Sequence, residues 1–261
     1  MMAMDERYSE QELEEAKAYL RDRLRNERSM AADVESLLTQ WAGYLLSALE
    51  RGASDDEIES IIADLVAALL DDCETLAVDE HDRRDAILLY MNGERHGKTL
   101  EGRVGERCHT YFNEIAAVYA AGRLLGMNTS SLLPVIKDYL EKPWTNPVLE
   151  TVREKIRRGE VAGDVKAFES PHFGSGIEIA SLGALKTITG FAIADAWMWW
   201  AYEDALSRGA RGYYVVRGSS YPCDECDSHT GIFYAIGDED NRPQYHLNCC
   251  CMVVYSYVDR V

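Results

Sequence analysis

Apolar residues recur at three- and four-residue intervals through most of the first 160 positions, which is the spacing of amphipathic helices. One apolar stripe covers residues 13–24 and a second covers residues 34–49, so two helices are expected there. Ser54 and Glu57 have the spacing of a capping box and open a third stripe over residues 58–69. The N-terminal part of the chain is therefore predicted to be helical.

Further helices are expected at about residues 100–126, 130–140 and 147–159, each followed by a glycine or proline stop signal. Residues 160–176 have few periodic apolar positions and are expected to form a connecting loop. A long helix rich in Ala, Trp and Tyr is expected at about residues 177–207.

Strand-forming sequence appears only near the C-terminus. Residues 212–217, 231–236 and 251–258 are short, β-branched and aromatic runs. The predicted fold class is α+β, with a mainly helical body followed by a small antiparallel β unit that carries a Cys/His cluster.

The same pattern divides the chain into three regions. Residues 1–95 are expected to form an N-terminal helical region, and residues 96–176 a second helical region with its connecting loop. Residues 177–261 are expected to contain the long helix and the β unit with the cysteine cluster.

Composition narrows the classes of protein that fit. The chain of 261 residues is 47% hydrophobic and has a formal net charge of −18, which disfavours non-specific binding to nucleic acid. Even the basic run at residues 21–28 is expected to be a solvated helix face with salt bridges. The first residues lack the layout of a signal peptide, so a reducing cytosolic origin is expected, where clustered cysteines more often bind metal than form disulfides.

Five of the seven cysteines lie in two short runs near the C-terminus. Cys223 and Cys226 form a C-x2-C pair, and after nineteen intervening residues His246 and Cys249 form an H-x2-C pair. Two such pairs supply the four ligands of a Cys3His zinc site of the structural type. The expected cofactor is therefore a structural zinc ion.

The fourth ligand has two candidates. Cys249 and Cys251 point the same way if the strand begins at Cys251, whereas Cys250 points away. The alternative that the thiols pack as small apolar groups, or oxidise, stays open. The candidate metal ligands are thus Cys223, Cys226, His246, Cys249 and Cys251.

Catalysis fits this cluster less well than metal binding. Three thiols that share one histidine suit a metal better than a nucleophile–base pair. A zinc hydrolase would need an open coordination position on the metal, with an acid as general base and a second histidine close to it. Glu225 and His229 are the candidates for these two residues. No catalytic or cofactor-binding residue is predicted, and the chain is not expected to be an enzyme.

Three tryptophans crowd into the long helix at Trp197, Trp199 and Trp200. A helix buried on most sides is one explanation for them. A protein–protein hot spot is the other, because Trp is enriched at such sites.

The C-terminal motif resembles the signature of the phage Mu F-like minor head protein family, also called phage head morphogenesis proteins. The matching positions are Cys223, Cys226, Gly231, Pro243, His246, Asn248, Cys249 and Cys251, and the resemblance extends over residues 97–258. Two positions depart from the family pattern. Cys250 stands where relatives have an arginine, and Ile188 stands where an acidic residue is usual.

The resemblance implies a minor capsid protein of a tailed phage that is associated with the portal and acts in head assembly or DNA packaging. Its implied partners are the portal and other head proteins, with packaged DNA contacted only indirectly and no membrane involved. The implied location is the virion at the portal vertex, and the host cytoplasm during assembly; the resemblance also allows several copies per particle. The alternative function is a zinc-dependent nuclease or hydrolase, or a phage-encoded effector.

Overall fold

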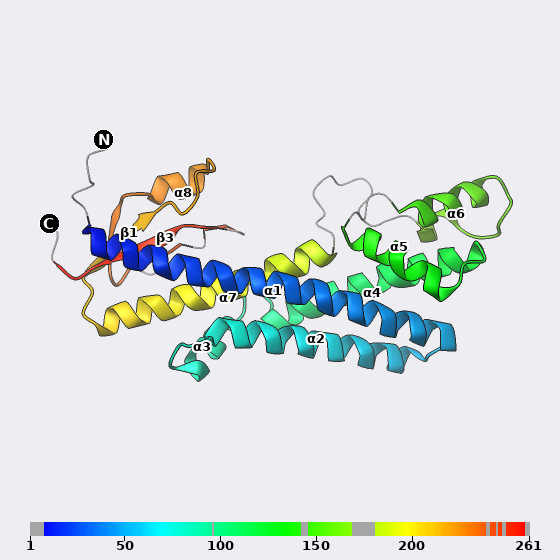
Figure 1. Cartoon of the computed structure of the whole chain (residues 1–261), viewed down its shortest axis with the longest axis horizontal. Helices are drawn as coiled ribbons and strands as arrows, with labels where there is room; N and C mark the ends of the chain where they lie inside the picture. The colour runs from blue at the N-terminus through cyan, green and yellow to red at the C-terminus, as the bar shows by residue number, and fades with distance from the viewer. Residues whose placement is uncertain are drawn as a thin grey trace. The chain divides into compact units, whose positions relative to one another are not determined.

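The computed structural model describes residues 8–95, 97–141, 146–168, 181–238, 241–243, 245–246 and 249–258 (Figure 1). The elements in chain order are α1 (Glu10–Arg51), α2 (Asp55–Val78), α3 (Arg84–Met91), α4 (Leu100–Leu124), α5 (Thr129–Glu141), α6 (Pro147–Arg157), the 3-10 helix η1 (Val165–Phe168), α7 (Ser181–Ser207), β1 (Gly212–Val216), α8 (Asp224–His229), β2 (Phe233–Ala235) and β3 (Met252–Ser256).

The predicted α+β class is confirmed. Helices make up most of the described chain, and one antiparallel sheet of order β2-β1-β3 lies near the C-terminus. The central strand β1 pairs with β2 from Gly212 to Tyr214 and with β3 along its whole length. None of the described helices contains a stretch long and apolar enough to span a lipid bilayer.

The prediction of two separate helices before Gly52 is wrong, because both apolar stripes belong to the single helix α1. The residues between the stripes include neither glycine nor proline, and the fully buried Met30 continues the apolar face across them. Helix α1 ends at Arg51, and Gly52 directly after it has a φ of 70°. The next helix starts as predicted, with the backbone N–H of Glu57 donating to Ser54 Oγ at 3.3 Å.

Several local predictions are refined rather than replaced. The expected connecting loop at residues 160–176 contains η1, and its last residues lie outside the described chain, as do the first residues of the predicted long helix. Helix α3 was not anticipated. The C-x2-C pair lies at the start of a short helix, α8, which was not predicted from the sequence either.

The chain forms two compact units. Unit 1 comprises Met1–Met30, Cys73–Gly93 and Thr189–Val261, and unit 2 comprises Ala31–Asp72 and Glu94–Ile188. Helices α1, α2 and α7 each contribute residues to both units. The division into three regions along the sequence stays a prediction.

In unit 2, α4 is held by buried side chains and one close helix contact. The hydroxyl of Tyr111 donates to the carbonyl of Leu38 in α1 at 2.6 Å, and Ser181 Oγ donates to Glu114 Oε1 at 3.1 Å. Gly122 lies against Leu132 of α5, where a Cβ would come within 2.3 Å of Leu132 Cδ2. The absence of a side chain at Gly122 therefore lets α5 pack closely on α4.

In unit 1, the sheet presents alternate residues of β3 to two different neighbours. Met252 and Val254 pack in one cluster with Ala16 and Leu20 of α1. Val253 packs in another cluster with Met198 of α7 and with the cysteines. Because successive strand residues face opposite sides, the sheet carries α1 on one face and the cysteine cluster on the other.

We expect opposite effects from two alanine substitutions in the same helix. Gly122→Ala places a methyl group against the buried Leu132 and should destabilise unit 2 by about 1–3 kcal/mol. Gly105→Ala is the matched control, because a Cβ at this position would meet no packed atom within 4 Å, and it should stabilise the helix by up to about 1 kcal/mol. Urea unfolding measures both changes. Equal effects would contradict the packing described for Gly122.

Candidate metal centre

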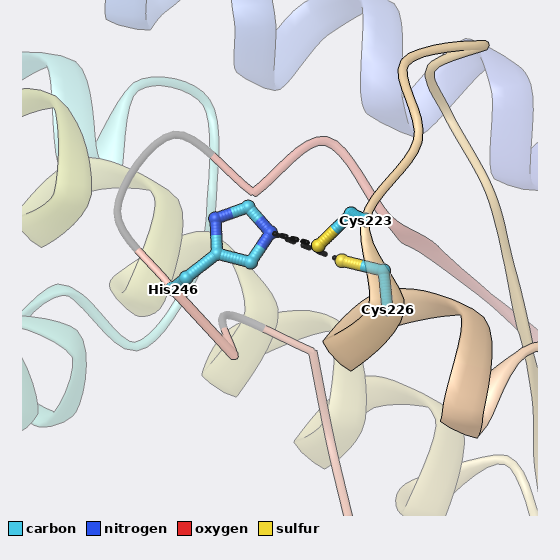
Figure 2. A group of neighbouring side chains, drawn as sticks. All are labelled: Cys223, Cys226 and His246. Carbon is cyan, nitrogen blue, oxygen red and sulfur yellow. Dashed lines mark hydrogen bonds between the residues drawn. The ribbon is translucent and has the colours of Figure 1, made fainter.

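The first two predicted ligands are positioned by the start of α8. Cys223 is the N-cap residue, and Cys226 follows in the first turn. The backbone N–H of Asp227 donates to the carbonyl of Cys223 at 2.8 Å, and Thr230 Oγ1 donates to the carbonyl of Cys226 at 2.9 Å. One helical turn thus directs both sulfur atoms to the same side of α8 (Figure 2).

His246 approaches this pair from the segment that precedes β3. Its Nε2 atom lies 3.3 Å from Cys223 Sγ and 3.1 Å from Cys226 Sγ (Figure 2). The three side chains converge although up to 23 residues separate them along the chain.

A second group of three donors shares Cys226 with the first. The sulfur atoms of Cys226, Cys249 and Cys251 lie within 4.8 Å of one another, and all three side chains are buried. Cys226 Sγ and Cys249 Sγ are 3.8 Å apart. Two thiolates bound to one tetrahedral zinc ion at about 2.3 Å would be separated by about 3.8 Å.

The structure thus brings together all five predicted ligand residues, in two groups that could each hold a metal ion: Cys223, Cys226 and His246, and Cys226, Cys249 and Cys251. The identity of the ion does not follow from these positions alone. Cys250 belongs to neither group and lies where the charges of Arg23 and Glu27 in α1 act on its thiol.

The protein environment gives the thiols different pKa values when no metal is bound. The pKa of Cys223 is lowered, chiefly because the backbone N–H of Cys226 stabilises the thiolate. Burial raises the pKa of Cys226 to about 12. The pKa of Cys251 is raised further, first by its hydrogen bond with the thiol of Cys249 and then by burial. A metal ion must therefore displace protons from the buried thiols in order to bind them.

His229, the candidate second histidine of a hydrolase, has a different set of contacts. Its Nδ1 atom is 2.9 Å from the hydroxyl of Tyr234, and its ring stacks on Tyr245 with centroids 4.1 Å apart. The hydroxyl of Tyr245 donates to the carbonyl of Asn241 at 2.7 Å. Because Tyr245 precedes His246, this stack holds the segment that presents the ligand.

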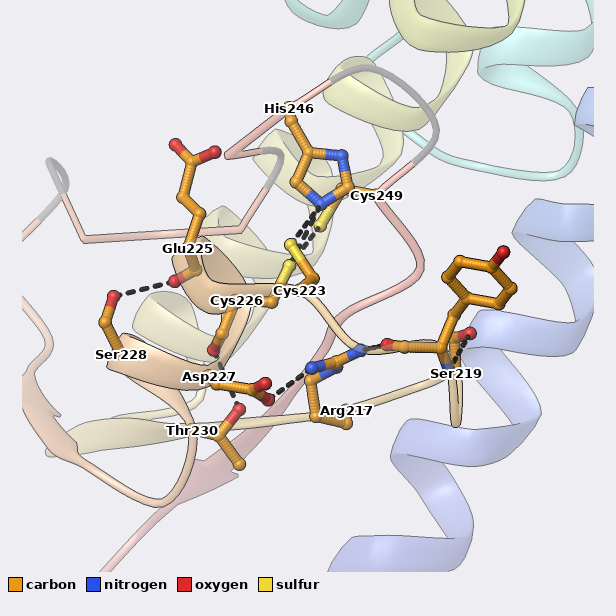
Figure 3. Close-up of polar contacts among 11 residues, drawn as sticks. Arg217, Ser219, Cys223, Glu225, Cys226, Asp227, Ser228, Thr230, His246 and Cys249 are labelled. Carbon is orange, nitrogen blue, oxygen red and sulfur yellow. Dashed lines mark hydrogen bonds and ion pairs between the residues drawn. The ribbon is translucent and has the colours of Figure 1, made fainter.

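Glu225, the candidate general base, has an exposed side chain and belongs to neither donor group. Figure 3 shows its carboxylate directed away from the sulfur atoms of Cys223 and Cys226. Neither Glu225 nor His229 therefore provides the acid–base arrangement that a zinc hydrolase needs.

Helix α1 also supports the site. Arg23 is fully buried, and its Nη2 atom donates to the carbonyl of Cys249 at 3.0 Å. Its Nε atom is 3.0 Å from Glu27 Oε1 within the helix. The prediction of a solvated face for residues 21–28 is therefore wrong at Arg23. The spacing of charges within one helix gave no signal for a contact 226 residues away.

Two further residues fix the loop between β1 and α8. Arg217 pairs with the carboxylate of Asp227 and donates to the carbonyl of Tyr221 (Figure 3). A Cβ on Gly218 would lie 1.8 Å from the carbonyl oxygen of Cys250 and 2.7 Å from Leu20 Cδ2. Only a glycine allows this loop to pass so close to the segment that carries Cys249 and Cys251.

Comparison with known proteins adds no family to these observations: no protein-family model matches the chain, and no curated protein or solved structure shows significant similarity to it.

The unequal pKa values predict an order of reaction in the reduced, metal-free protein. Cys223 should be alkylated by iodoacetamide at a lower pH than Cys226, because a lowered pKa increases the thiolate fraction whereas a pKa of about 12 leaves Cys226 protonated at pH 8. Peptide mass spectrometry over a pH series measures the rates. Buried Cys73, in the same unit, should stay unmodified and reports that unit 1 remains folded. Equal alkylation rates at Cys223 and Cys226 would contradict the lowered pKa of Cys223 and the raised pKa of Cys226.

Proposed function

We propose that the chain is a minor head protein of a tailed phage, with a C-terminal β unit held together by one structural zinc ion. The observation that carries this proposal is that Cys226 belongs to two donor groups, one with Cys223 and His246 and one with Cys249 and Cys251. These residues are also the centre of the motif that resembles the phage head morphogenesis signature.

Zinc is the proposed metal because three thiolates and one imidazole are its usual ligands in structural sites. The distance of 3.8 Å between Cys226 Sγ and Cys249 Sγ supports two thiolates on one tetrahedral ion at this position. We assign Cys249 as the fourth ligand. Cys251, which is hydrogen-bonded to Cys226 and Cys249, would then polarise the bound thiolates.

A structural role explains where the ligands come from. Cys223 and Cys226 follow β1, whereas His246 and Cys249 precede β3. The sheet has only three strands, of five, three and five residues, and buries little apolar surface by itself. An ion that joins the two segments would supply the missing stability.

The role in the phage head rests on the resemblance, and the structural features support it in a general way. The helices of the two units offer surface for protein contacts, and a small β unit closed by zinc fits the layout that the signature implies. The proposed partners remain the portal and other head proteins, and the proposed location is the virion. The contacts of Glu225 and His229 described above do not favour the alternative of a zinc hydrolase, so we do not propose that activity.

Elemental analysis of protein purified under reducing conditions should give about one zinc ion per chain. Cys223→Ser and His246→Ala should each reduce the bound zinc and destabilise unit 1 by more than about 3 kcal/mol, because each removes a ligand. Cys250→Ser is the matched control and should keep full zinc content, since Cys250 belongs to neither donor group. Zinc-free wild-type protein, or loss of zinc in Cys250→Ser, would contradict the proposed site.

Purified virions of the phage that encodes this chain should contain it, and it should co-purify with the portal protein when the two are expressed together. Quantitative mass spectrometry of particles measures its presence and its ratio to the portal. Particles that lack the chain while it accumulates free in the host cell would contradict the role in the head and leave the zinc assignment intact.

A further inference from the structure

A second candidate site lies in unit 1, away from the cysteines. An open pocket of about 160 Å³ is lined by the first turns of α1, the second half of α7, and β3 with the residue that follows it. Its lining residues are Glu12, Glu15, Ala16, Tyr19, Met198, Trp200, Ala201, Asp204, Arg208, Val253, Tyr255 and Tyr257. A cavity of about 150 Å³ is large enough to hold a benzene molecule.

The walls of the cavity are largely aromatic. Tyr19, Trp200, Tyr255 and Tyr257 contribute four rings, whose faces attract cations. Two contacts hold Trp200 in place. Its Nε1 atom donates to Asp82 Oδ1 at 3.1 Å, and its ring stacks on the imidazole of His81 with centroids 3.8 Å apart. The aromatic wall is therefore formed before any ligand arrives.

The charged side chains around the cavity carry an excess of negative charge. Three carboxylates, Glu12, Glu15 and Asp204, face one guanidinium, Arg208. Arg208 Nε lies 2.9 Å from Asp204 Oδ2, and its guanidinium is 5.3 Å from the centroid of the Tyr257 ring. Arg208 thus neutralises the charge of Asp204, and its guanidinium makes a cation–π contact with the ring of Tyr257. Glu12 accepts hydrogen bonds from Ser9, and Glu15 accepts one from Gln11. Neither donor is charged, so both carboxylates keep a negative charge that attracts a cation.

The hydroxyl groups of the cavity also lack partners. The hydroxyls of Tyr19, Tyr255 and Tyr257 are buried, and within the described part of the chain none of them has a hydrogen-bond partner. Buried hydroxyls without partners are unfavourable, so a ligand that satisfies them is stabilised. A primary ammonium has three N–H donors and no acceptor, which complements phenol oxygens acting as acceptors.

We propose that this cavity binds a primary alkylammonium group on an apolar stem of about five heavy atoms. The rings surround the stem and the cationic head, and Glu12 and Glu15 provide the opposite charge. A free alkylamine and the lysine side chain of another protein have this chemistry in common. Carboxylates are repelled by the same charges, and a neutral alcohol gains neither the cation–ring nor the carboxylate attraction.

Binding to the full-length protein is tested with n-pentylamine, 1-pentanol and pentanoate by calorimetry and by tryptophan fluorescence, to which Trp200 contributes. Pentylamine should bind saturably, at least about tenfold more tightly than pentanol, and pentanoate should not bind. Its affinity should also fall as salt is added. Comparable binding of pentylamine and pentanol, or no saturable binding of pentylamine, would overturn the proposal.

Substitutions locate the binding in this cavity. Glu15→Gln should weaken the affinity for pentylamine about fivefold. Glu14→Gln should leave the affinity unchanged, because Glu14 is outside the cavity and pairs with Lys17. Both positions are exposed, so thermal melting should show both variants folded. Equal affinity of the Glu15→Gln variant and the wild type would also overturn the proposal.

A final comparison separates the two sources of the ammonium group. Nα-acetyl-lysine methylamide carries the same stem on a peptide backbone. If it binds as tightly as pentylamine, the cavity accepts a lysine side chain of a partner protein. If only pentylamine binds, the ligand is a free amine.

Discussion

The convergence of two thiols after β1 with an imidazole and a thiol before β3 is the constraint on which the C-terminal unit depends. Cys223 and Cys226 are presented by one turn of α8, and His246 reaches both sulfur atoms within 3.3 Å. The sheet has only three short strands, so it gains stability from any contact that joins these two segments. A metal ion bound at this point would fix β1 and β3 relative to each other, and it would thereby also fix the two faces that the sheet presents.

The surroundings of the cluster link this constraint to the helices of unit 1. Arg23 in α1 holds the carbonyl of Cys249, and Gly218 lets the loop after β1 pass against Cys250. On the same face of the sheet as α1, Met252 and Val254 pack on Ala16 and Leu20. The first part of α1 is thus attached to the strand that follows the last candidate ligands. The aromatic cavity lies beside the same strand, so its shape depends on this packing too.

Local features of this fold could be read from the sequence, whereas contacts between distant residues could not. Periodicity predicted most helices and the three strands, and spacing alone identified the five candidate ligands. Periodicity failed at α1, because a change in the position of the apolar stripe does not end a helix that lacks a breaker. Arg23 was missed because its charged neighbours resemble a solvated face, and the carbonyl that it contacts belongs to Cys249, far along the chain.

X-ray absorption at the zinc edge tests the central claim most directly, because it reports the ligands of the bound metal. The account predicts three sulfur neighbours at about 2.3 Å and one nitrogen neighbour at about 2.0–2.1 Å, with the scattering pattern of an imidazole ring. Four sulfur neighbours without an imidazole would show that Cys251 takes the place of His246. A shell of oxygen and nitrogen atoms alone would contradict the cysteine site altogether.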